Sequence, residues 1–438
     1  MKAIIQTKNG AVVGSTENGV SKFLGIPFAQ APIGENRFQK PKAVENWDSP
    51  LVCDSYKPKC PQLLIPINPD NGLEQNEDCL YLNVWAPENA KNCPVMFWTF
   101  GGSLVAGEGS DETYDGTHLA KTGDVIVVTY NYRVGVFGGF YNFSKFDGLK
   151  GKYVENTGIY DALEALRWVK DNIAAFGGDS DNIILFGESA GAAITGTLYA
   201  MPQTEGLFSK AIMQSYPNMM ALKDPNNPCE ERMLEEWGLT ASTADGMLNK
   251  STAEILEAFK KMCNGMVPRA GALIQADGEL VKMDDVAQLS SHSGNKPLLI
   301  GTNKDEAAIF VPPSDEWTET QEKMKIGMTE MMFRQPTLAF ANAAAEKNPV
   351  YIYRFDFAPQ IAKKTHKGAF HSAEMPYVFG NLSCPMAGII KGSEIEAKAV
   401  SDEMVSVWTK FAHTGNPGWT SLNDNGGAWC FDTPSHAE

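Results

Sequence analysis

A serine stands between two glycines at residues 187–191, Gly-Glu-Ser-Ala-Gly, directly after an apolar run at 183–186. A buried strand that ends in a tight, glycine-flanked turn is the local structure that exposes a serine hydroxyl for attack on a carbonyl carbon. The segment at 192–199 has small residues and few strand formers, and it can begin a helix whose N-terminal dipole faces Ser189. Only three of the five positions carry the pattern, so an ordinary strand-to-helix turn explains it equally well until partner groups are found.

A serine hydroxyl is a weak nucleophile unless a base takes its proton and an acid orients that base. His371 lies in a loop after an apolar run at 350–353, where a base at the carboxyl edge of a sheet is expected. Two carboxylates, Asp305 and Glu306, follow another apolar run at 297–300, and their spacing leaves both open as the acid. Serine, acid and histidine stand in the chain order expected when a serine elbow of this kind lies on an α/β sheet. A solvated loop histidine and surface charges are the plain alternatives.

The negative charge that develops in acyl transfer needs backbone N–H donors. One donor would be the N–H of Ala190, directly after the serine. A loop with two glycines, Phe-Gly-Gly-Ser-Leu at 100–104, follows an apolar run at 95–99, and its glycines let the backbone approach a substrate closely. Together the two segments predict an oxyanion hole, with a plain turn as the alternative for the loop.

Six short apolar runs predict the strands that position these groups. They lie at 95–100, 125–130, 183–186, 211–213, 297–300 and 350–353. Between the second and third runs, apolar residues from Leu163 to Ile173 recur with the spacing of one helix face, and Gly177 ends that helix. Strands that alternate with helices indicate an α/β fold with a mostly parallel sheet and helices on both faces.

Two segments interrupt this alternation, at about 217–293 and 307–348, and both mix polar and apolar residues as helices do. Insertions on such a sheet sit at one end and often cover the pocket. We therefore expect one elaborated catalytic domain over 1–438, because open α/β sheets with insertions reach this size as one unit.

Composition and charge disfavour several classes of function. Hydrophobic residues make up 43% and charged residues 21% of the 438 residues, as in folded globular proteins. A net charge of −16 disfavours nucleic acids and anionic membrane surfaces as partners. The eight cysteines form no C-x-x-C pair and no Cys/His cluster with zinc spacing, so no metal is expected.

The N-terminus shows no apolar core with a cleavage site, and no apolar run approaches the roughly 18 residues of a membrane span. The default expectation is a cytoplasmic protein whose cysteines are mostly reduced and buried. The oligomeric state stays open.

Taken in order, these segments resemble the type-B carboxylesterase family, α/β hydrolases that include cholinesterases and bacterial p-nitrobenzyl esterases. The resemblance covers most of the chain and rests, besides the His371 loop, on the segments at 25–29, 35–38, 77–84, 131–135, 165–169, 176–179, 186–191, 301–306 and 377–380. The α/β-hydrolase fold of this family has the sheet expected above. So many matches in the same order make chance negligible.

The resemblance implies a serine carboxylic ester hydrolase that forms an acyl-enzyme intermediate and needs no cofactor. Its substrates would be small to medium, short-acyl or aryl, ester molecules. The nucleophile would be Ser189, the base His371, and the acid Glu306 rather than Asp305. Around these three, the resemblance places the oxyanion donors Gly102, Ser103 and Ala190, and the neighbours Glu188 and Ser215.

Further structural features follow from the same resemblance. Two structural ion pairs are implied, Arg37 with Glu77 and Arg133 with Asp161. Cys60 and Cys79 match positions that are bonded in secreted relatives, and whether they form a disulfide in this chain stays open.

The chain departs from the family's pattern in two places. Ser103 stands where relatives have a third glycine, so a Cβ enters the space around the acyl or alcohol group and turnover of bulky tertiary-alcohol esters is in doubt. His371 follows Glu306 by only 65 residues (371 − 306), fewer than in cholinesterases, and we expect a more open pocket. Candidate lining residues, for which ordinary core is the alternative, are Leu104, Phe137 and Met375.

Other functions remain as alternatives. Some cholinesterase-like proteins are non-catalytic binding or adhesion proteins, but those have usually lost one triad member and this chain keeps all three. An amidase or a lipase could use the same scaffold, because the same triad serves those reactions.

Overall fold

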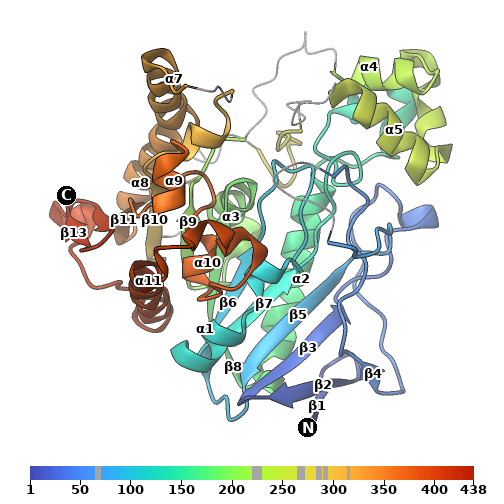
Figure 1. Ribbon diagram of the computed structural model, residues 1–438. Helices are drawn as coiled ribbons and strands as arrows, with labels where there is room; N and C mark the ends of the chain where they lie inside the picture. The colour runs from blue at the N-terminus through green and yellow to red at the C-terminus, as the bar shows by residue number, and fades with distance from the viewer. Residues whose placement is uncertain (65–70, 220–228, 264–271, 283–288, 290–293, 313–315) are drawn as a thin grey trace.

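The computed structural model describes residues 1–64, 71–219, 229–263, 272–282, 289, 294–312 and 316–438. One mixed sheet of 13 strands runs through this part of the chain (Figure 1). In spatial order the strands are β1 (Lys2–Gln6), β2 (Ala11–Glu17), β3 (Val20–Pro27), β5 (Tyr81–Pro87), β7 (Ile126–Tyr130), β6 (Cys93–Thr99), β8 (Gly178–Glu188), β9 (Lys210–Gln214), β10 (Leu298–Asn303), β11 (Val350–Phe355), β12 (Trp429–Phe431) and β13 (His436–Ala437), while β4 (Leu51–Val52) pairs with β2.

The six strands predicted from apolar runs, together with β12, form the parallel part of this sheet. From β7 to β12 every neighbouring pair is parallel, and all residues of β6, β7 and β10 are buried. Strands covered by helices on both faces have this continuous burial, so the predicted mostly parallel sheet is confirmed. The pairs from β1 to β7 are antiparallel. The apolar runs did not predict β1 and β2, because their residues are largely exposed or half-buried.

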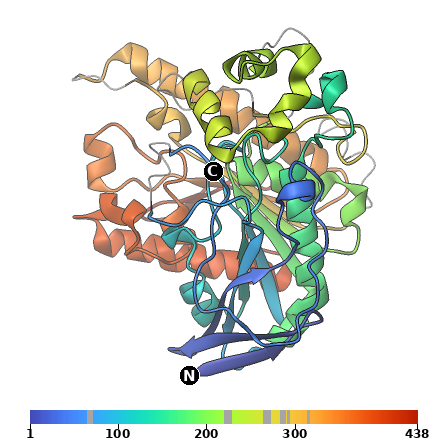
Figure 2. The same ribbon diagram turned by 90° about the vertical axis from the view of Figure 1, so that its right-hand side faces the viewer.

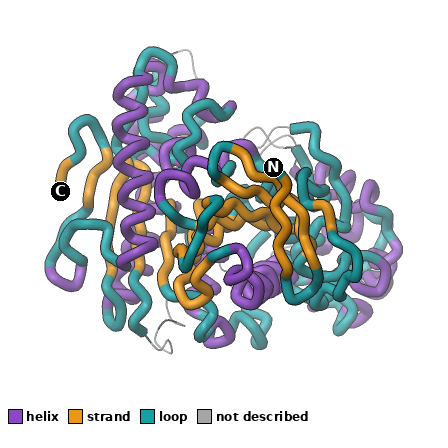
Figure 3. Tube along the Cα trace, turned by 90° about the horizontal axis from the view of Figure 1, so that it is seen from below, coloured by secondary structure: helices purple, strands orange, loops and turns teal. Residues whose placement is uncertain are grey.

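Helices cover both faces of the sheet, as predicted, and side chains along β6 show which helix covers which face. Val95 and Phe97 pack into a core cluster with α2, α3 and α8. Met96 and Trp98 point the other way, into a cluster with α1, α10 and α11. Seen from below in Figure 3, helices lie to either side of the strands. The α-helices are α1 (Thr117–Gly123), α2 (Thr157–Asn172), α3 (Ala190–Ala200), α4 (Cys229–Glu236), α5 (Thr252–Cys263), α7 (Glu319–Thr329), α8 (Gln335–Ala345), α9 (Gln360–Lys364), α10 (Met375–Val378) and α11 (Glu394–Thr414).

The helix predicted between the second and third apolar runs is α2. It continues into the 3-10 helix η5 (Ile173–Phe176) and ends at Gly177. The φ angle of Gly177 is 88°, a left-handed conformation that glycine adopts without the steric cost of a side chain.

The two inserted segments contain helices. The first holds α4, the 3-10 helix η7 (Ala241–Asn249) and α5, and the second holds α7, the π-helical turn η10 (Glu330–Arg334) and α8. Figures 1 and 2 show α4, α5 and α7 at the end of the molecule opposite the N-terminal strands β1 and β2. No helix of the described part is both long and apolar enough to cross a bilayer.

Both arginine–carboxylate pairs implied by the resemblance are formed. Arg133, just after β7, donates two hydrogen bonds of 2.8 Å to Asp161 of α2, and both side chains are buried. Arg37 donates two hydrogen bonds of 2.7 Å to Glu77. Such bidentate geometry fixes orientation as well as distance, so the Arg133 pair holds the loop after β7 against α2.

Cys60 and Cys79, whose pairing the sequence leaves open, are both buried and free. A hydrogen bond with Cys60, together with burial, raises the pKa of the Cys79 thiol well above its ordinary value. The reactive form in disulfide chemistry is the thiolate, so Cys79 is kept in its less reactive thiol form.

Candidate active site

β8 leads into a sharp turn at Ser189, and α3 begins at the next residue. The serine backbone has φ 56° and ψ −127°, a strained conformation that presents its side chain at the end of the strand. Glycine is required on both sides. A Cβ at Gly187 would lie 2.6 Å from the carbonyl oxygen of Gly191, and one at Gly191 would lie 2.1 Å from that of Thr99. The glycine-flanked serine therefore forms a strand–turn–helix elbow, as predicted.

The structure brings the side chains of Ser189, His371 and Glu306 into one hydrogen-bonded line. The Nε2 atom of His371 lies 2.8 Å from the Oγ of Ser189, and its Nδ1 lies 2.6 Å from Oε2 of Glu306. Ser189 follows β8, Glu306 begins the 3-10 helix η9 (Glu306–Ile309) after β10, and His371 lies in the loop beyond β11. His371 and Glu306 are buried, whereas Ser189 is partly exposed. The serine is therefore the member of the line that a substrate can reach.

Glu306 is anchored through the oxygen that does not face the imidazole. Its Oε1 accepts a 2.7 Å hydrogen bond from the backbone N–H of Asn303 and a 2.5 Å one from the hydroxyl of Ser215. The backbone carbonyl of Glu306 also accepts the N–H of His371 at 3.1 Å. These contacts leave Oε2 free for Nδ1, and they place Ser215 beside the acid, as the resemblance implies.

Asp305, the carboxylate that spacing could not separate from Glu306, has a different environment. Its Oδ2 accepts the N–H of Ala369 at 3.1 Å, and its Oδ1 pairs with Lys325 of α7 at 2.7 Å. The N–H of Asp305 also donates to the carbonyl of Ala369 at 2.9 Å. Asp305 therefore ties the loop that carries His371 to α7.

Glu188, the residue before the serine, also reaches the imidazole. Its Oε1 lies 3.3 Å from Nε2 of His371 and accepts a 2.6 Å hydrogen bond from the hydroxyl of Ser372. Burial raises the pKa of the Glu188 carboxyl, while the neighbouring His371 and Ser372 oppose that rise.

Glu374 is a third buried carboxyl group near His371, and sequence reasoning missed it. Its oxygens accept hydrogen bonds from the side-chain amides of Gln214, at 3.0 Å, and Asn303, at 2.6 Å. Burial, followed by the charges of other carboxylates, raises its pKa to about 8, so Glu374 is mostly protonated at neutral pH. The signal that could have found it is one acidic residue in an otherwise apolar stretch three positions after the histidine.

These carboxyl groups decide the protonation of the imidazole. Burial lowers the pKa of His371, but the charges of Glu188 and Glu306, together with the hydrogen bond between Nδ1 and Glu306, outweigh burial and raise it to about 9. A pocket that stabilises the imidazolium form favours the transfer of a proton from a serine hydroxyl to the histidine.

The predicted oxyanion donors lie against the elbow. A Cβ at Gly101 would lie 3.0 Å from the Cβ of Ser189, so the glycine loop and the serine are in direct contact. Within the described residues, the N–H groups of Gly102, Ser103 and Ala190 donate to no protein acceptor. Unpaired backbone donors in the elbow and in the loop that touches it can bind an anionic oxygen.

Two aromatic rings cover the imidazole. The ring centroid of Phe333, in the π-helical turn η10, lies 4.5 Å from that of His371, and the ring of Phe310 lies 5.7 Å away. The two phenylalanines stack on each other at 6.2 Å. Both belong to the chain between Glu306 and His371, so this short segment still supplies apolar cover for the base. Sequence reasoning missed both rings; π-helical turns are frequent at functional sites.

The residues expected to line the pocket are deeply buried. Leu104, Phe137 and Met375 are 0%, 4% and 1% exposed. Phe137 stacks on Phe38 at 6.0 Å, and the Sδ of Met375 accepts a hydrogen bond from Gln214. These contacts favour the ordinary-core alternative for Phe137 and Met375, while Leu104, in the glycine loop, stays a candidate.

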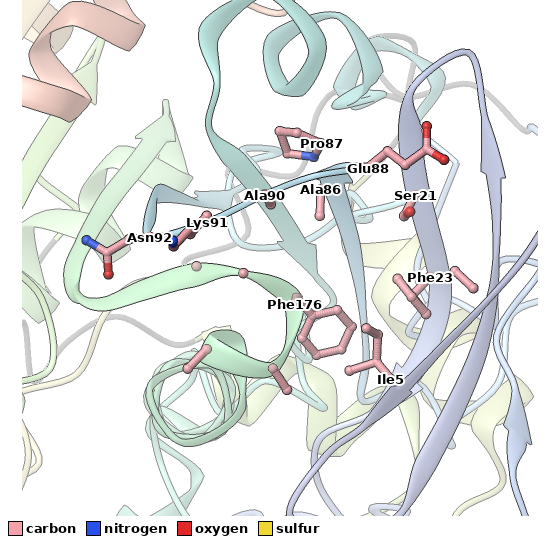
Figure 4. A pocket seen from close by; sticks show the side chains of 15 residues that line it. Ile5, Ser21, Phe23, Ala86, Pro87, Glu88, Ala90, Lys91, Asn92 and Phe176 are labelled. Carbon is pink, nitrogen blue, oxygen red and sulfur yellow. The ribbon is translucent and has the colours of Figure 1, made fainter.

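A pocket of about 590 Å³ lies away from the serine. Figure 4 shows Ile5, Phe23 and Phe176 around it. Its wall also contains Asn92, which precedes β6, and Gly178, which is the first residue of β8. The amino ends of parallel strands lie at the opposite edge of the sheet from their carboxyl ends, so this pocket cannot hold a substrate against the elbow.

Comparison with known proteins gives a consistent assignment. Residues 1–325 and 312–429 match the model of the carboxylesterase family. The para-nitrobenzyl esterase of Bacillus subtilis (strain 168) is 36% identical over 457 residues, which cover 96% of this chain and 91% of that protein. Acetylcholinesterase of Bungarus fasciatus is 31% identical over 511 residues, with coverage of 99% and 82%. The solved structure of a thermophilic PNB esterase matches with a TM-score of 0.91 at 34% identity, over 100% of this chain and 98% of that one. The chain therefore belongs to the carboxylesterase family, with the α/β-hydrolase fold and the carboxylic ester hydrolase activity of that family.

Proposed function

We propose that Ser189, His371 and Glu306 hydrolyse esters as nucleophile, base and acid. The observation that carries this proposal is the pair of contacts made by one imidazole, 2.8 Å to the serine Oγ and 2.6 Å to the glutamate. Nε2 takes the hydroxyl proton as Oγ attacks the ester carbonyl, and the imidazolium then protonates the departing alcohol. Water activated by the same histidine releases the acid from the acyl-enzyme.

The negative charge on the tetrahedral oxygen is held by the N–H groups of Gly102, Ser103 and Ala190. Two observations support this part of the proposal. These groups have no acceptor within the described protein, and α3 begins at Ala190, so its N-terminal dipole adds positive potential at the same place.

We further propose that the substrates are small to medium esters with short-acyl or aryl groups. Ser103 carries a Cβ where relatives have glycine, which leaves less room around a branched acyl or alcohol group. Phe310 and Phe333 lie beside His371, which must reach the oxygen of the departing alcohol, so a flat apolar alcohol has an aromatic surface to contact. The name of the bacterial relative, para-nitrobenzyl esterase, agrees with this preference.

We also infer that residues 1–438 form one catalytic domain in which the described parts of segments 217–293 and 307–348 cover the pocket; residues 220–228, 264–271, 283–288, 290–293 and 313–315 lie outside the described residues. For the second segment, the support is the packing of Phe333 on His371. A cytoplasmic location stays a prediction. A non-catalytic role has no observation in its favour, because the side chains of the proposed triad lie within hydrogen-bond distance of one another.

Replacing the nucleophile tests the proposal most simply. In Ser189→Ala, kcat for p-nitrophenyl acetate falls by about six orders of magnitude, because the remaining histidine has no hydroxyl to activate. A fluorophosphonate probe adds its mass to the wild-type protein and to Ser49→Ala, an exposed-serine control, but not to Ser189→Ala. Turnover by Ser189→Ala within tenfold of wild type contradicts the assignment.

Ser103→Gly tests the substrate preference. Loss of the Cβ makes room beside the acyl-enzyme, so kcat/KM for tert-butyl acetate relative to p-nitrophenyl acetate rises by about tenfold, a low value for one carbon in a binding pocket. The wild-type protein and the variant are also assayed with p-nitrophenyl esters of increasing acyl length and with p-nitroacetanilide. Preference for long acyl chains would indicate a lipase, faster anilide cleavage would indicate an amidase, and either result contradicts the proposed preference.

Glu188→Gln tests the charges around the base. The histidine must be neutral to accept a proton, so kcat/KM rises as the pH passes upward through its pKa, which the carboxylates raise above the ordinary 6.5. Removing the negative charge 3.3 Å from Nε2 lowers that pKa, and the rising limb moves to lower pH by about one unit. Glu45→Gln, at an exposed glutamate, serves as the control and leaves the profile in place. An unchanged midpoint, or a shift to higher pH in Glu188→Gln, argues against this electrostatic account.

A further inference from the structure

The glycine loop that carries two of the oxyanion donors contains an unusual turn. Ser103 and Leu104, neither of them glycine, have φ angles of 57° and 62°, so two successive residues adopt the left-handed conformation. The N–H groups of Val105 and Ala106 both donate to the carbonyl of Gly102, at 3.0 and 3.1 Å, and close the turn. Backbone strain of this kind persists only where the surrounding structure holds it.

Contacts on either side of the turn hold it in place. The carbonyl of Leu104 accepts the N–H of Gly135 at 2.7 Å. Gly107, directly after the turn, folds back on its beginning: a Cβ there would lie 2.4 Å from the ring of Phe100 and 2.7 Å from the carbonyl oxygen of Gly101. A displacement of Gly107 would therefore be transmitted to the first residues of the loop.

The side-chain amide of Gln62 clamps Gly107 from another part of the chain. Its Oε1 accepts the N–H of Gly107 at 2.6 Å, and its Nε2 donates to the carbonyl of Gly107 at 3.0 Å and to that of Cys60 at 3.0 Å. One amide thus fixes both peptide groups that flank Gly107. Gln62 is only 4% exposed, and its own N–H donates to Oε1 of Gln75 at 2.9 Å.

A second contact joins the segment that contains Gln62 to the segment that contains Gly107. Nζ of Lys59 lies 3.1 Å from Oε1 of Glu108, and both side chains are 1% exposed. Lys59 precedes Gln62 by three residues, and Glu108 follows Gly107. The Lys59 pair brings the two segments together, while the amide of Gln62 sets the orientation of the peptide groups next to the turn.

We propose that Gln62 is a positioning residue for the oxyanion hole, acting through Gly107 on the strained turn at Ser103 and Leu104. This inference rests on the proposed function. Without the clamp, the turn relaxes toward ordinary backbone angles and the N–H groups of Gly102 and Ser103 no longer converge on the tetrahedral oxygen. Because that negative charge exists only in the transition state and the tetrahedral intermediate, the effect is on kcat rather than on KM.

Gln62→Met and Gln62→Glu test this role. Methionine keeps the length of the side chain without its polar groups, and an ionised glutamate can accept from Gly107 but cannot donate. For p-nitrophenyl acetate, kcat falls by about ten- to a hundredfold in both variants, up to the loss reported for removal of one oxyanion donor, while KM changes less than twofold. Gln275→Met, which removes a buried amide that donates to the carbonyls of Leu273 and Phe140, keeps the wild-type kcat.

A trifluoromethyl ketone separates positioning from a general loss of structure. It forms a tetrahedral adduct with an active serine and places an anionic oxygen in the hole, so its Ki weakens in proportion to the loss of kcat/KM. The thermal unfolding midpoint of each Gln62 variant shows whether that variant is folded. One folded variant of the two is sufficient for the test. A folded variant with wild-type kcat or Ki, or an equal loss in Gln275→Met, overturns the inference. Ser189→Ala is measured alongside: undiminished turnover in that variant contradicts the proposed function itself.

Discussion

Parallel pairing of β6, β8, β9, β10 and β11 brings the carboxyl ends of these strands to one edge of the sheet. The register pairs Thr99 with Gly187, Gly187 with Met213, and Asn303 with Phe355. Each group of the candidate site follows one of these strand ends: the glycine loop, the elbow, Ser215, the acid and the histidine loop. Hydrogen bonding across the sheet therefore positions the strand ends, and the segments that follow them bring the side chains together.

Burial of charge is the second constraint. An isolated imidazole that is 4% exposed would lose its positive form, yet here Glu188 and Glu306 stabilise that form on opposite sides of one ring. The carboxyl groups also repel one another, which contributes to the raised pKa of Glu374. Proton transfer from the serine partly relieves this imbalance, because the positive charge it creates lies between carboxylates. The negative carboxylates, whose burial costs free energy, thus favour the transfer of a proton to the imidazole of His371.

Two turns with left-handed backbone at non-glycine residues lie at the site. Ser189 has a positive φ angle, and so do Ser103 and Leu104. The elbow is held by glycines that let α3 approach the end of β6, and the glycine loop is held by the carbonyl contact of Leu104 and the amide of Gln62. Non-glycine residues in such conformations stay ordered only where neighbours restrain them. The geometry of the two turns therefore depends on residues that are distant from them in the sequence.

Features with a strong local pattern could be predicted from the sequence. The six buried strands are continuous apolar runs, and the elbow shows itself locally in the glycines at 187 and 191, of which Gly187 is required by a contact within the turn itself. The choice of Glu306 over Asp305 could not be made from spacing, because it depends on Ser215 and the N–H of Asn303 reaching one carboxylate and Lys325 reaching the other.

Other features lacked a local signal. Glu374, Phe333 and Gln62 act through partners distant in sequence. The sequence could not show that Phe137 and Met375 are buried against core residues, because an apolar side chain can either line a pocket or fill a core. The half-exposed strands β1 and β2 lack the continuous apolar runs that identified the buried strands.

The central claim is that one imidazole activates Ser189 so that the acyl group passes through a covalent bond to that serine. Rapid mixing of the protein with p-nitrophenyl acetate, followed by acid quenching within the first turnover and peptide mass spectrometry, tests it most directly. The account predicts a burst of one p-nitrophenolate per chain and one acetyl group on the peptide that contains Ser189. An acyl group on another residue, or turnover without an adduct on Ser189, would contradict it.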